Sequence, residues 1–326
     1  MPAFMAECTP TMLRGMVMAQ LQLQIAVAQL VAAVINFGTS TINSDVGWRT
    51  YIGCHEAAGY SLSKLRKKEI SNHDIQNELD VLAHSKGNRG KGTWREVFRG
   101  TNRRRSGIAL IVMIGQQITG QAFISQYAVY FYKQQGFQDA FELGVIQQAL
   151  GVIQQALGVT AVIFATFIVD SFGRRNILLS GGVMTTTFLF IMGAIGTIAH
   201  PSHTQNQVMV SCFMLWFFFY LLSWAPVPYI VLGEVSSRRI TEKTNNLAVS
   251  FSVLSAFLVS FTVPYLISPE YANLGAKVGF IYGSLSVIFT TLTYAFVPEM
   301  TGKSLEVLDV LFERKVPTRK FSQTRG

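Results

Sequence analysis

The sequence contains seven uninterrupted stretches of 21 or more residues that lack any Asp, Glu, Lys or Arg. About 20 apolar residues in a helix cross the hydrocarbon core of a bilayer. One such stretch could be the buried helix of a soluble core, but seven predict an all-α membrane protein. The stretches are continuously apolar rather than alternating, which excludes a transmembrane β-barrel. They cover residues 15–44, 107–132, 143–169, 176–201, 205–233, 244–269 and 278–298.

The charged residues support this interpretation because they are few and clustered. Half of the chain is apolar and 14% is charged. Of the net charge of +9, residues 60–105 supply +7, from 12 Lys or Arg against 5 Asp or Glu. A basic loop between apolar stretches marks the cytoplasmic side of a membrane protein, so we expect no nucleic-acid binding. Cys8, Cys54 and Cys212 have neither metal-ligand nor disulfide spacing, so no metal site is expected.

Basic clusters at alternate junctions predict how the last six stretches are oriented. Residues 103–105, 174–175, 238–243 and the C-terminal tail are basic, whereas the other junctions carry few, mixed charges. The basic ends are therefore expected in the cytoplasm. Residues 47–64 are too short and too polar to cross, so the first stretch must end on the side of the basic loop. With seven crossings and a cytoplasmic tail, Met1 is expected outside.

A group of polar side chains lies inside the second stretch. The segment reads Gln116-Gln117-Ile118-Thr119-Gly120-Gln121. On a continuous helix, Gln117 and Gln121 share one face, and Gln116, Gly120 and Tyr127 share the adjacent one. Such glutamines either line a hydrophilic passage or bond neighbouring helices, at about 0.6 kcal/mol each. The stretch alone leaves both interpretations open.

Two prolines interrupt the fifth stretch. Pro226 and Pro228 each lack a backbone N–H and clash with the preceding helical turn. Broken helices at membrane depth require protein or a watery cavity around them, and they often mark a transporter's binding site. Trp224 and Tyr229 flank the break and offer aromatic rings with polar tips, suited to stacking on a sugar ring. The alternative is a kink that only serves packing.

Two further local features predict helices. Residues 144–150 recur unchanged as 151–157, and because seven residues advance a helix by nearly two turns, one helix near 40 Å long can contain both copies. Gln154 and Gln155 in the second copy are candidates for the same passage. Residues 72–83 predict a short amphipathic helix, and residues 93–99 a surface helix anchored by Trp94 and Phe98.

Several motifs, in order along the chain, resemble those of the sugar porters of the major facilitator superfamily. Any one of these motifs is weak, but together they cover nearly the whole chain. The lead-in at 98–105 and the segment at 118–123 are most similar to fungal α-glucoside/maltose-type porters. The motifs are Glu7-x-x-Pro-x-x-x-Arg14-Gly15, Gln116-Gln117-x-x-Gly120, Asp170-Ser-Phe-Gly-Arg174-Arg175, Pro226-Val-Pro-Tyr with Glu234-Val-Ser-Ser-x-Arg239, and Pro298-Glu299-Met-Thr-Gly302-Lys303-Ser-Leu-Glu306.

The resemblance implies an incomplete major facilitator fold, with a C-terminal six-helix half and one helix of the N-terminal half. By this resemblance, family spans one to four and span six are expected to have no counterpart here, and we expect the chain alone not to transport. The implied divisions are a remnant helix at 1–46, a basic cytoplasmic linker with short helices at 47–105, a six-helix bundle at 106–298 and a cytoplasmic tail at 299–326.

The resemblance also implies a function: transmembrane transport of a sugar, either an α-glucoside or disaccharide or a hexose, by alternating access. Amides suit sugar hydroxyls because both donate and accept hydrogen bonds. Ala122 stands where the family has Asn, which puts monosaccharide-type contacts in doubt and is compatible with a different substrate. The substrate-binding residues expected from these arguments are Gln22, Gln116, Gln117, Gln121, Tyr127, Trp224 and Tyr229, with Pro226 and Pro228 as the helix break.

Charged residues at the cytoplasmic helix ends match a family network that locks the outward-open state. Their alternative role is only to set topology. The expected members are Asp170, Arg174, Arg175, Glu234, Arg239 and Glu299.

Other functional classes receive less support. Proton coupling would require a carboxylate inside a span. The seven stretches contain none, and in proton-coupled sugar porters it lies in the first family span, so the sequence leaves proton symport and uniport both open. A sugar sensor or regulatory partner of a full-length porter is the alternative function, although the tail after Leu311 is short. The spans hold no constellation for catalysis, and no nucleotide motif occurs, so we expect no enzyme activity and no cofactor. The expected partners are a sugar, the lipid bilayer and, in an intact relative, a proton; the expected location is the plasma membrane.

Overall fold

The structure is a computed structural model. It describes residues 19, 23–31, 93–124, 140–198, 202–237, 240–268 and 270–321, with only the backbone described at 140–150 and 203. The first uncharged stretch is described only at Ala19 and 23–31, so its predicted crossing lies largely outside the described residues. The predicted helix at 72–83 lies outside them entirely.

Within the described residues the chain is all helical, and six helices are long and apolar enough to cross a membrane. They correspond to the last six uncharged stretches, as predicted. The long helices are α6 (Gly100–Ile118), α8 (Ala140–Phe172), α9 (Arg174–Ile195), α10 (His203–Leu222) with α11 (Val227–Val235) continuing the same span, α12 (Thr241–Ile267) and α13 (Val278–Phe296). Short elements are α5 (Trp94–Val97), η1 (Gly275–Lys277), α14 (Leu305–Glu313) and η2 (Thr318–Lys320).

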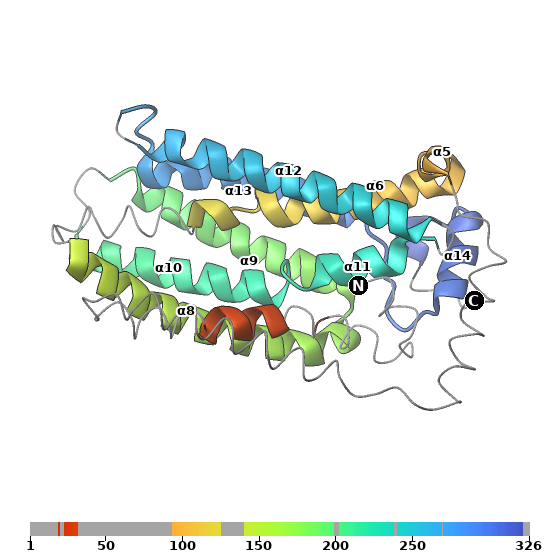
Figure 1. The fold of residues 1–326 in the computed structure, drawn as a ribbon, viewed down its shortest axis with the longest axis horizontal. Helices are drawn as coiled ribbons and strands as arrows, with labels where there is room; N and C mark the ends of the chain where they lie inside the picture. The colour runs from red at the N-terminus through yellow and green to blue at the C-terminus, as the bar shows by residue number, and fades with distance from the viewer. Residues whose placement is uncertain are drawn as a thin grey trace, which may run out of the picture.

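The long helices run side by side in a bundle, with α5 and α14 at one end (Figure 1). Helix α13 packs on α9, α12 on α6, and α10 on both α9 and α8. Small residues allow the closest of these approaches. A Cβ on Gly279 of α13 would lie 2.6 Å from the backbone oxygen of Leu189 in α9. Nearby, the hydroxyl groups of Thr186 and Ser286 bond across the same pair at 2.7 Å, as small residues do between membrane helices.

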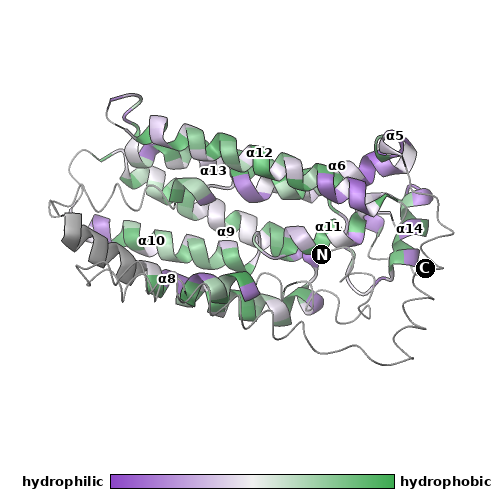
Figure 2. Ribbon diagram, viewed as in Figure 1, coloured by the Kyte–Doolittle hydropathy of each residue, from purple (hydrophilic) through white to green (hydrophobic). Residues whose placement is uncertain are grey.

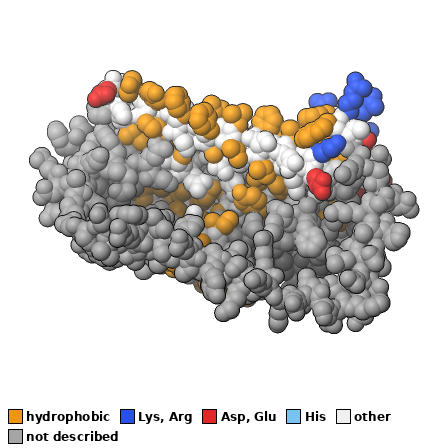
Figure 3. Space-filling view, viewed as in Figure 1, with side chains coloured by type: hydrophobic (Ala, Val, Ile, Leu, Met, Phe, Trp, Pro, Cys, Tyr) orange, Lys and Arg blue, Asp and Glu red, His pale blue; other side chains and the backbone are white. Residues whose placement is uncertain are grey.

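The outer surface of the bundle is apolar. Large side chains of α12, among them Phe257, Leu258 and Phe261, are exposed along most of its length. Hydrophobic residues dominate the long helices (Figure 2), and on the visible part of the described surface hydrophobic and uncharged groups lie side by side, with the charged side chains toward the ends (Figure 3). A hydrocarbon environment removes the cost of exposing such a surface to water.

Helix α8 contains both copies of the seven-residue repeat without interruption. It has 33 residues, or about 50 Å at 1.5 Å per residue. This confirms that one helix absorbs the duplication, and it is longer than expected because it extends past both ends of the uncharged stretch.

Two local predictions need correction. Helix α6 ends at Ile118, and Thr119 and Gly120 form a turn, with φ of +102° at Gly120, before helical residues resume at 121–124. Gln117 and Gln121 therefore do not share the face of one unbroken helix. The predicted helix at 93–99 exists as α5, but Trp94 and Phe98 are exposed, and buried Val97 anchors it instead.

Candidate functional site

The break between α10 and α11 leaves backbone carbonyls without their usual partners. Residues Ser223–Pro226 form turns, and α11 starts with Pro228 in its first turn. Pro228 has no N–H to donate to the carbonyl of Trp224 four residues earlier. A buried carbonyl without a partner is costly. The carbonyls at the break therefore need a hydrogen-bond donor from another helix.

Gln116 of α6 supplies that donor. Its Nε2 donates to the carbonyl of Trp224 at 3.1 Å and to that of Ala225 at 3.0 Å. Its Oε1 accepts from Nε2 of Gln117 at 3.3 Å. The side chain is buried, and both N–H groups are engaged. In this conformation Gln116 braces the helix break, so it is less available to a ligand than expected.

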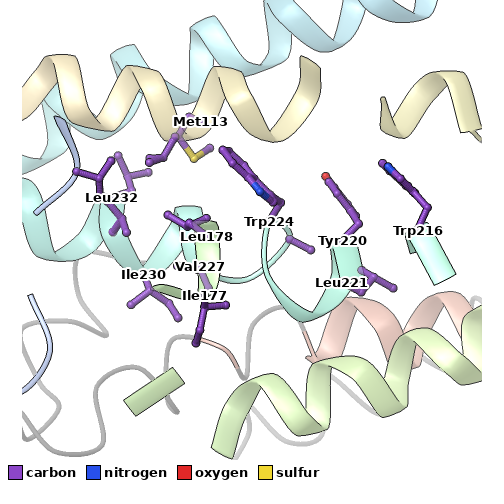
Figure 4. Packing of buried hydrophobic residues seen from close by; sticks show 14 of the residues in the cluster. Met113, Ile177, Leu178, Trp216, Tyr220, Leu221, Trp224, Val227, Ile230 and Leu232 are labelled. Carbon is purple, nitrogen blue, oxygen red and sulfur yellow. The ribbon is translucent and has the colours of Figure 1, made fainter. Parts of the chain in front are cut away.

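An aromatic row on α10 leads to the break. Trp216, Tyr220 and Trp224 lie one turn apart and point toward α6 (Figure 4). The rings of Trp216 and Tyr220 stack, with centroids 4.9 Å apart and planes 10° from parallel. The Tyr220 hydroxyl lies within hydrogen-bond distance of the Gln116 carbonyl, at 3.1 Å, and of Gln121 Oε1, at 2.9 Å. The sequence analysis missed Tyr220, although its four-residue spacing from both tryptophans was visible.

Trp224 occupies a different environment from the one expected of a stacking platform. It is fully buried. A Cβ on Gly115 of α6 would lie 2.7 Å from its ring. Its indole fills the space that this glycine leaves, so here the ring packs α10 against α6 rather than facing a ligand.

Three of the expected ligand-facing side chains remain accessible. Gln117 and Tyr229 are half-buried and Gln121 is exposed. Gln117 and Gln121 flank the break at Gly120, and Tyr229 follows the break at Pro226. Gln22 and Tyr127 lie outside the described residues. Gln154 and Gln155, half-buried on α8, have no described contact with this group.

A second polar group, entirely charged, lies at the end of the bundle near α14. The guanidinium of Arg174 at the start of α9 is 2.8 Å from Asp170 Oδ1 in α8 and 3.0 Å from Glu234 Oε1 in α11. It also donates to the carbonyl of Val169 at 3.3 Å. Arg174 is only 1% exposed and Glu234 3%. Ion pairs this deep are strongly sensitive to loss of one partner.

Glu299 joins the same group through backbone bonds. Its carboxylate accepts from the N–H groups of Arg174 at 3.0 Å and Arg175 at 3.2 Å, where the positive end of the α9 dipole favours an anion. Gly173, with φ of +90°, makes room, because a Cβ there would lie 2.5 Å from the carboxylate. The structure thus brings together five of the six expected network residues; Arg239 lies outside the described part.

A third contact set ties α14 to the start of α6. Arg105 pairs with Asp309, and Arg104 donates to the Val316 carbonyl at 2.7 Å. Both guanidinium groups lie over the ring of Phe312. The sequence analysis treated these arginines only as orientation signals. No group of three or more His, Cys, Asp or Glu within the described ranges could hold a metal ion.

Comparison with known families gives one match over most of the chain. The family described as "Sugar (and other) transporter" matches residues 1–55 and 51–312.

Curated relatives and solved structures are consistent with that match. The chain is 24% identical to "Probable glucose transporter rco-3" of Neurospora crassa, covering 96% of this chain and 58% of the relative. It is 27% identical to "High-affinity hexose transporter ght4" of Schizosaccharomyces pombe, covering 97% and 61%. The chain thus spans less than two thirds of either relative. Both are transporters rather than enzymes.

Among solved structures, the proton:xylose symporter XylE bound to 6-bromo-6-deoxy-D-glucose superposes with a TM-score of 0.73 at 22% identity, covering 96% of this chain and 70% of that one. The inward-open form of XylE from E. coli gives a TM-score of 0.67 at 21% identity, covering 95% and 68%. At this identity the likeness shows the fold alone, a partial major facilitator fold.

Proposed function

The chain belongs to the sugar (and other) transporter family, and on that premise we propose that it forms a sugar-binding wall of a hexose transporter. The chain is an integral membrane protein by its apolar spans and its family. Glucose and hexose transporters are the named relatives, which favours a hexose over the α-glucoside expected from residues 98–105. The α-glucoside is kept as a second substrate to be tested.

The proposal divides the polar residues near the two breaks into two roles. Gln117, Gln121 and Tyr229 are accessible, so they are the residues we assign to the sugar, with amides for its hydroxyls and a ring for its apolar face. Gln116 and Tyr220 hold the backbone of the breaks and the Gln121 amide in place. One observation carries the proposal: the accessible amides of Gln117 and Gln121 lie beside a helix break that Gln116 holds in place, inside an apolar bundle.

The charged group around Arg174 is proposed to close one end of the passage. Its members come from α8, α9, α11 and the segment after α13. Any movement of one of these elements against the others must break buried charge contacts, which biases a two-state equilibrium. In this proposal the group stabilises the state in which this end is closed, as alternating access requires.

The regional division of the chain is also proposed. Residues 1–46 and 106–298 are taken as the membrane parts, with 47–105 and 299–326 in the cytoplasm, following the basic junctions. We propose the plasma membrane as the location and a sugar, with or without a coupled proton, as the partner.

Cysteine accessibility tests the binding wall. In a chain with Cys8 and Cys54 changed to Ser and Cys212 to Ala, single cysteines are placed at 116, 117, 121 and 229. We expect a water-soluble thiol reagent to label positions 117, 121 and 229 but not 116, and glucose to slow that labelling. Protection by maltose and not by glucose would favour the α-glucoside. No labelling at 117, 121 and 229, or labelling that neither sugar affects, would refute the binding wall.

A further inference from the structure

Helix α5 presents two large aromatic side chains away from the bundle. Trp94, the first residue of α5, is 53% exposed, and Phe98, which directly follows the helix, is 57% exposed. The helix lies at the end of the molecule where Lys and Arg side chains gather on the visible surface (Figures 1 and 3). The sugar proposal makes no use of this pair.

The chain holds α5 firmly in this orientation. Val97, which lies between the two aromatic residues in the chain, is fully buried. Its carbonyl accepts from Ser106 Oγ in α6 at 3.0 Å, and the Glu96 carbonyl accepts from Asn102 Nδ2 at 3.1 Å. Helix α6 starts at Gly100, whose φ of +57° makes the sharp turn. These contacts hold α5 against α6 and leave the two aromatic side chains exposed.

Basic side chains surround the pair. Arg95, Arg99 and Arg103 are exposed, and Nζ of Lys243, from α12, lies 5.7 Å from the centre of the Trp94 ring. The acidic groups nearby are Glu96, which accepts from Thr93 Oγ1 at 3.1 Å, and Glu242. Four basic groups against two acidic ones leave a positive surface around two apolar rings.

The position of α5 relative to the membrane indicates which kind of molecule can bind beside it. The uncharged stretch of α6 begins at Gly107, and Gly100 is seven residues earlier, or about 10 Å along a helix. The lipid headgroups extend about 5–7 Å beyond the hydrocarbon core on each side, so α5 is expected at their outer edge. Tryptophan is enriched at the membrane–water interface, and clustered Lys and Arg beside a span attract anionic lipids of the cytoplasmic leaflet.

We propose that Trp94 and Phe98, with Arg95, Arg99, Arg103 and Lys243, form a docking site for an anionic phospholipid. The basic groups bind the headgroup phosphate, and the rings pack against the glycerol and upper acyl region. Basic groups alone would serve any anion, but the aromatic pair between them suits a molecule that carries both phosphate and acyl chains. Such a lipid would fix the start of α6, which carries the Gln116 brace, against the membrane surface.

A lipid titration tests the proposal. The full chain in detergent is titrated with phosphatidylserine, and in parallel with phosphatidylcholine, while the midpoint of thermal unfolding is followed. We expect phosphatidylserine to raise the midpoint saturably and phosphatidylcholine to have little effect. In R95Q, R99Q and R103Q the apparent affinity should fall about fivefold per variant, which corresponds to about 1 kcal/mol per basic group. W94A/F98A should lose most of the shift.

A matched control and a direct probe keep the test decisive. Y271A/K277Q removes an exposed aromatic and an exposed basic group at the opposite end of the bundle and should bind phosphatidylserine as the unchanged chain does. Brominated phosphatidylserine should quench more fluorescence in the unchanged chain than in the conservative variant W94F. Equal shifts with both lipids, an unchanged titration in W94A/F98A, quenching unaffected by W94F, or a full shift with inorganic phosphate would each overturn the proposal.

Discussion

The two polar regions of the bundle are held together by different chemistry. At the break between α10 and α11, the contacts are neutral: the amide of Gln116 bonds two carbonyls, and Tyr220 adds a hydroxyl. At the end near α14, the contacts are ionic: Arg174 meets Asp170 and Glu234, and Glu299 caps the start of α9.

This difference follows from depth in the membrane. An uncompensated charge far from water is far more expensive than an unpaired amide or carbonyl. Neutral groups can therefore brace a broken helix in mid-span, whereas ion pairs are restricted to the ends, where water can reach them when the contacts open. A neutral brace also leaves no charge behind when it separates, which suits a region expected to admit a sugar.

The largest expected effect tests the ionic end. R174M removes the guanidinium that contacts both Asp170 and Glu234 and takes a positive charge away from the nearly buried Glu234. We expect the free energy of unfolding to fall by about 3–5 kcal/mol, measured by denaturant unfolding in detergent micelles. R314M, at an exposed arginine after α14, is the control and should change little.

A second variant separates lost charge from lost packing. R174M/E234L also replaces the nearly buried Glu234 carboxylate, so it should recover part of the stability lost in R174M. If R174M lowers the free energy of unfolding no more than R314M does, the ionic region is not a buried charge cluster. The contrast with the mid-span region would then be wrong.

An intermediate effect is expected at the neutral brace. Q116L leaves the carbonyls of Trp224 and Ala225 without the amide that bonds them. Each buried unpaired group costs about 1–3 kcal/mol, so the free energy of unfolding should fall by at least that much in the same assay. Q117L removes a single hydrogen bond, the one to Gln116 Oε1, whereas Q116L removes the donor to two carbonyls, so Q117L should cost less than Q116L. Equal losses in the two variants would show that Gln116 is not a brace.

The smallest effect is expected from one hydroxyl. Y220F keeps the ring that stacks on Trp216 but removes the contacts with Gln116 and Gln121. A loss of about 0.5–1.5 kcal/mol is expected, together with weaker glucose protection of a cysteine at 117. Y271F, at an exposed tyrosine, serves as the matched control. An unchanged protection pattern in Y220F would remove Tyr220 from the positioning role.

Much of the architecture could be predicted because it depends on local properties. The uncharged stretches predicted the last six spans, and Pro226 and Pro228 predicted the break, since a missing N–H acts wherever the proline lies. The repeat at 144–157 was compatible with one long helix because of helical periodicity alone. The turn at Gly120 was not foreseen, because isolated glycines are tolerated in many membrane helices.

The sequence by itself determined which segments are helical and apolar, where the charges lie and which motifs the chain carries. Only the tertiary structure decided what each polar side chain does. Gln116 and Gln117 are neighbours of the same type, yet one is buried on two carbonyls of another helix and the other stays accessible. Trp224 fills the space beside Gly115, and Glu299 reaches the start of α9 across more than a hundred residues. Periodicity and hydropathy describe a helix one residue at a time, whereas a hydrogen bond or a packing contact depends on which helix lies opposite and at what height.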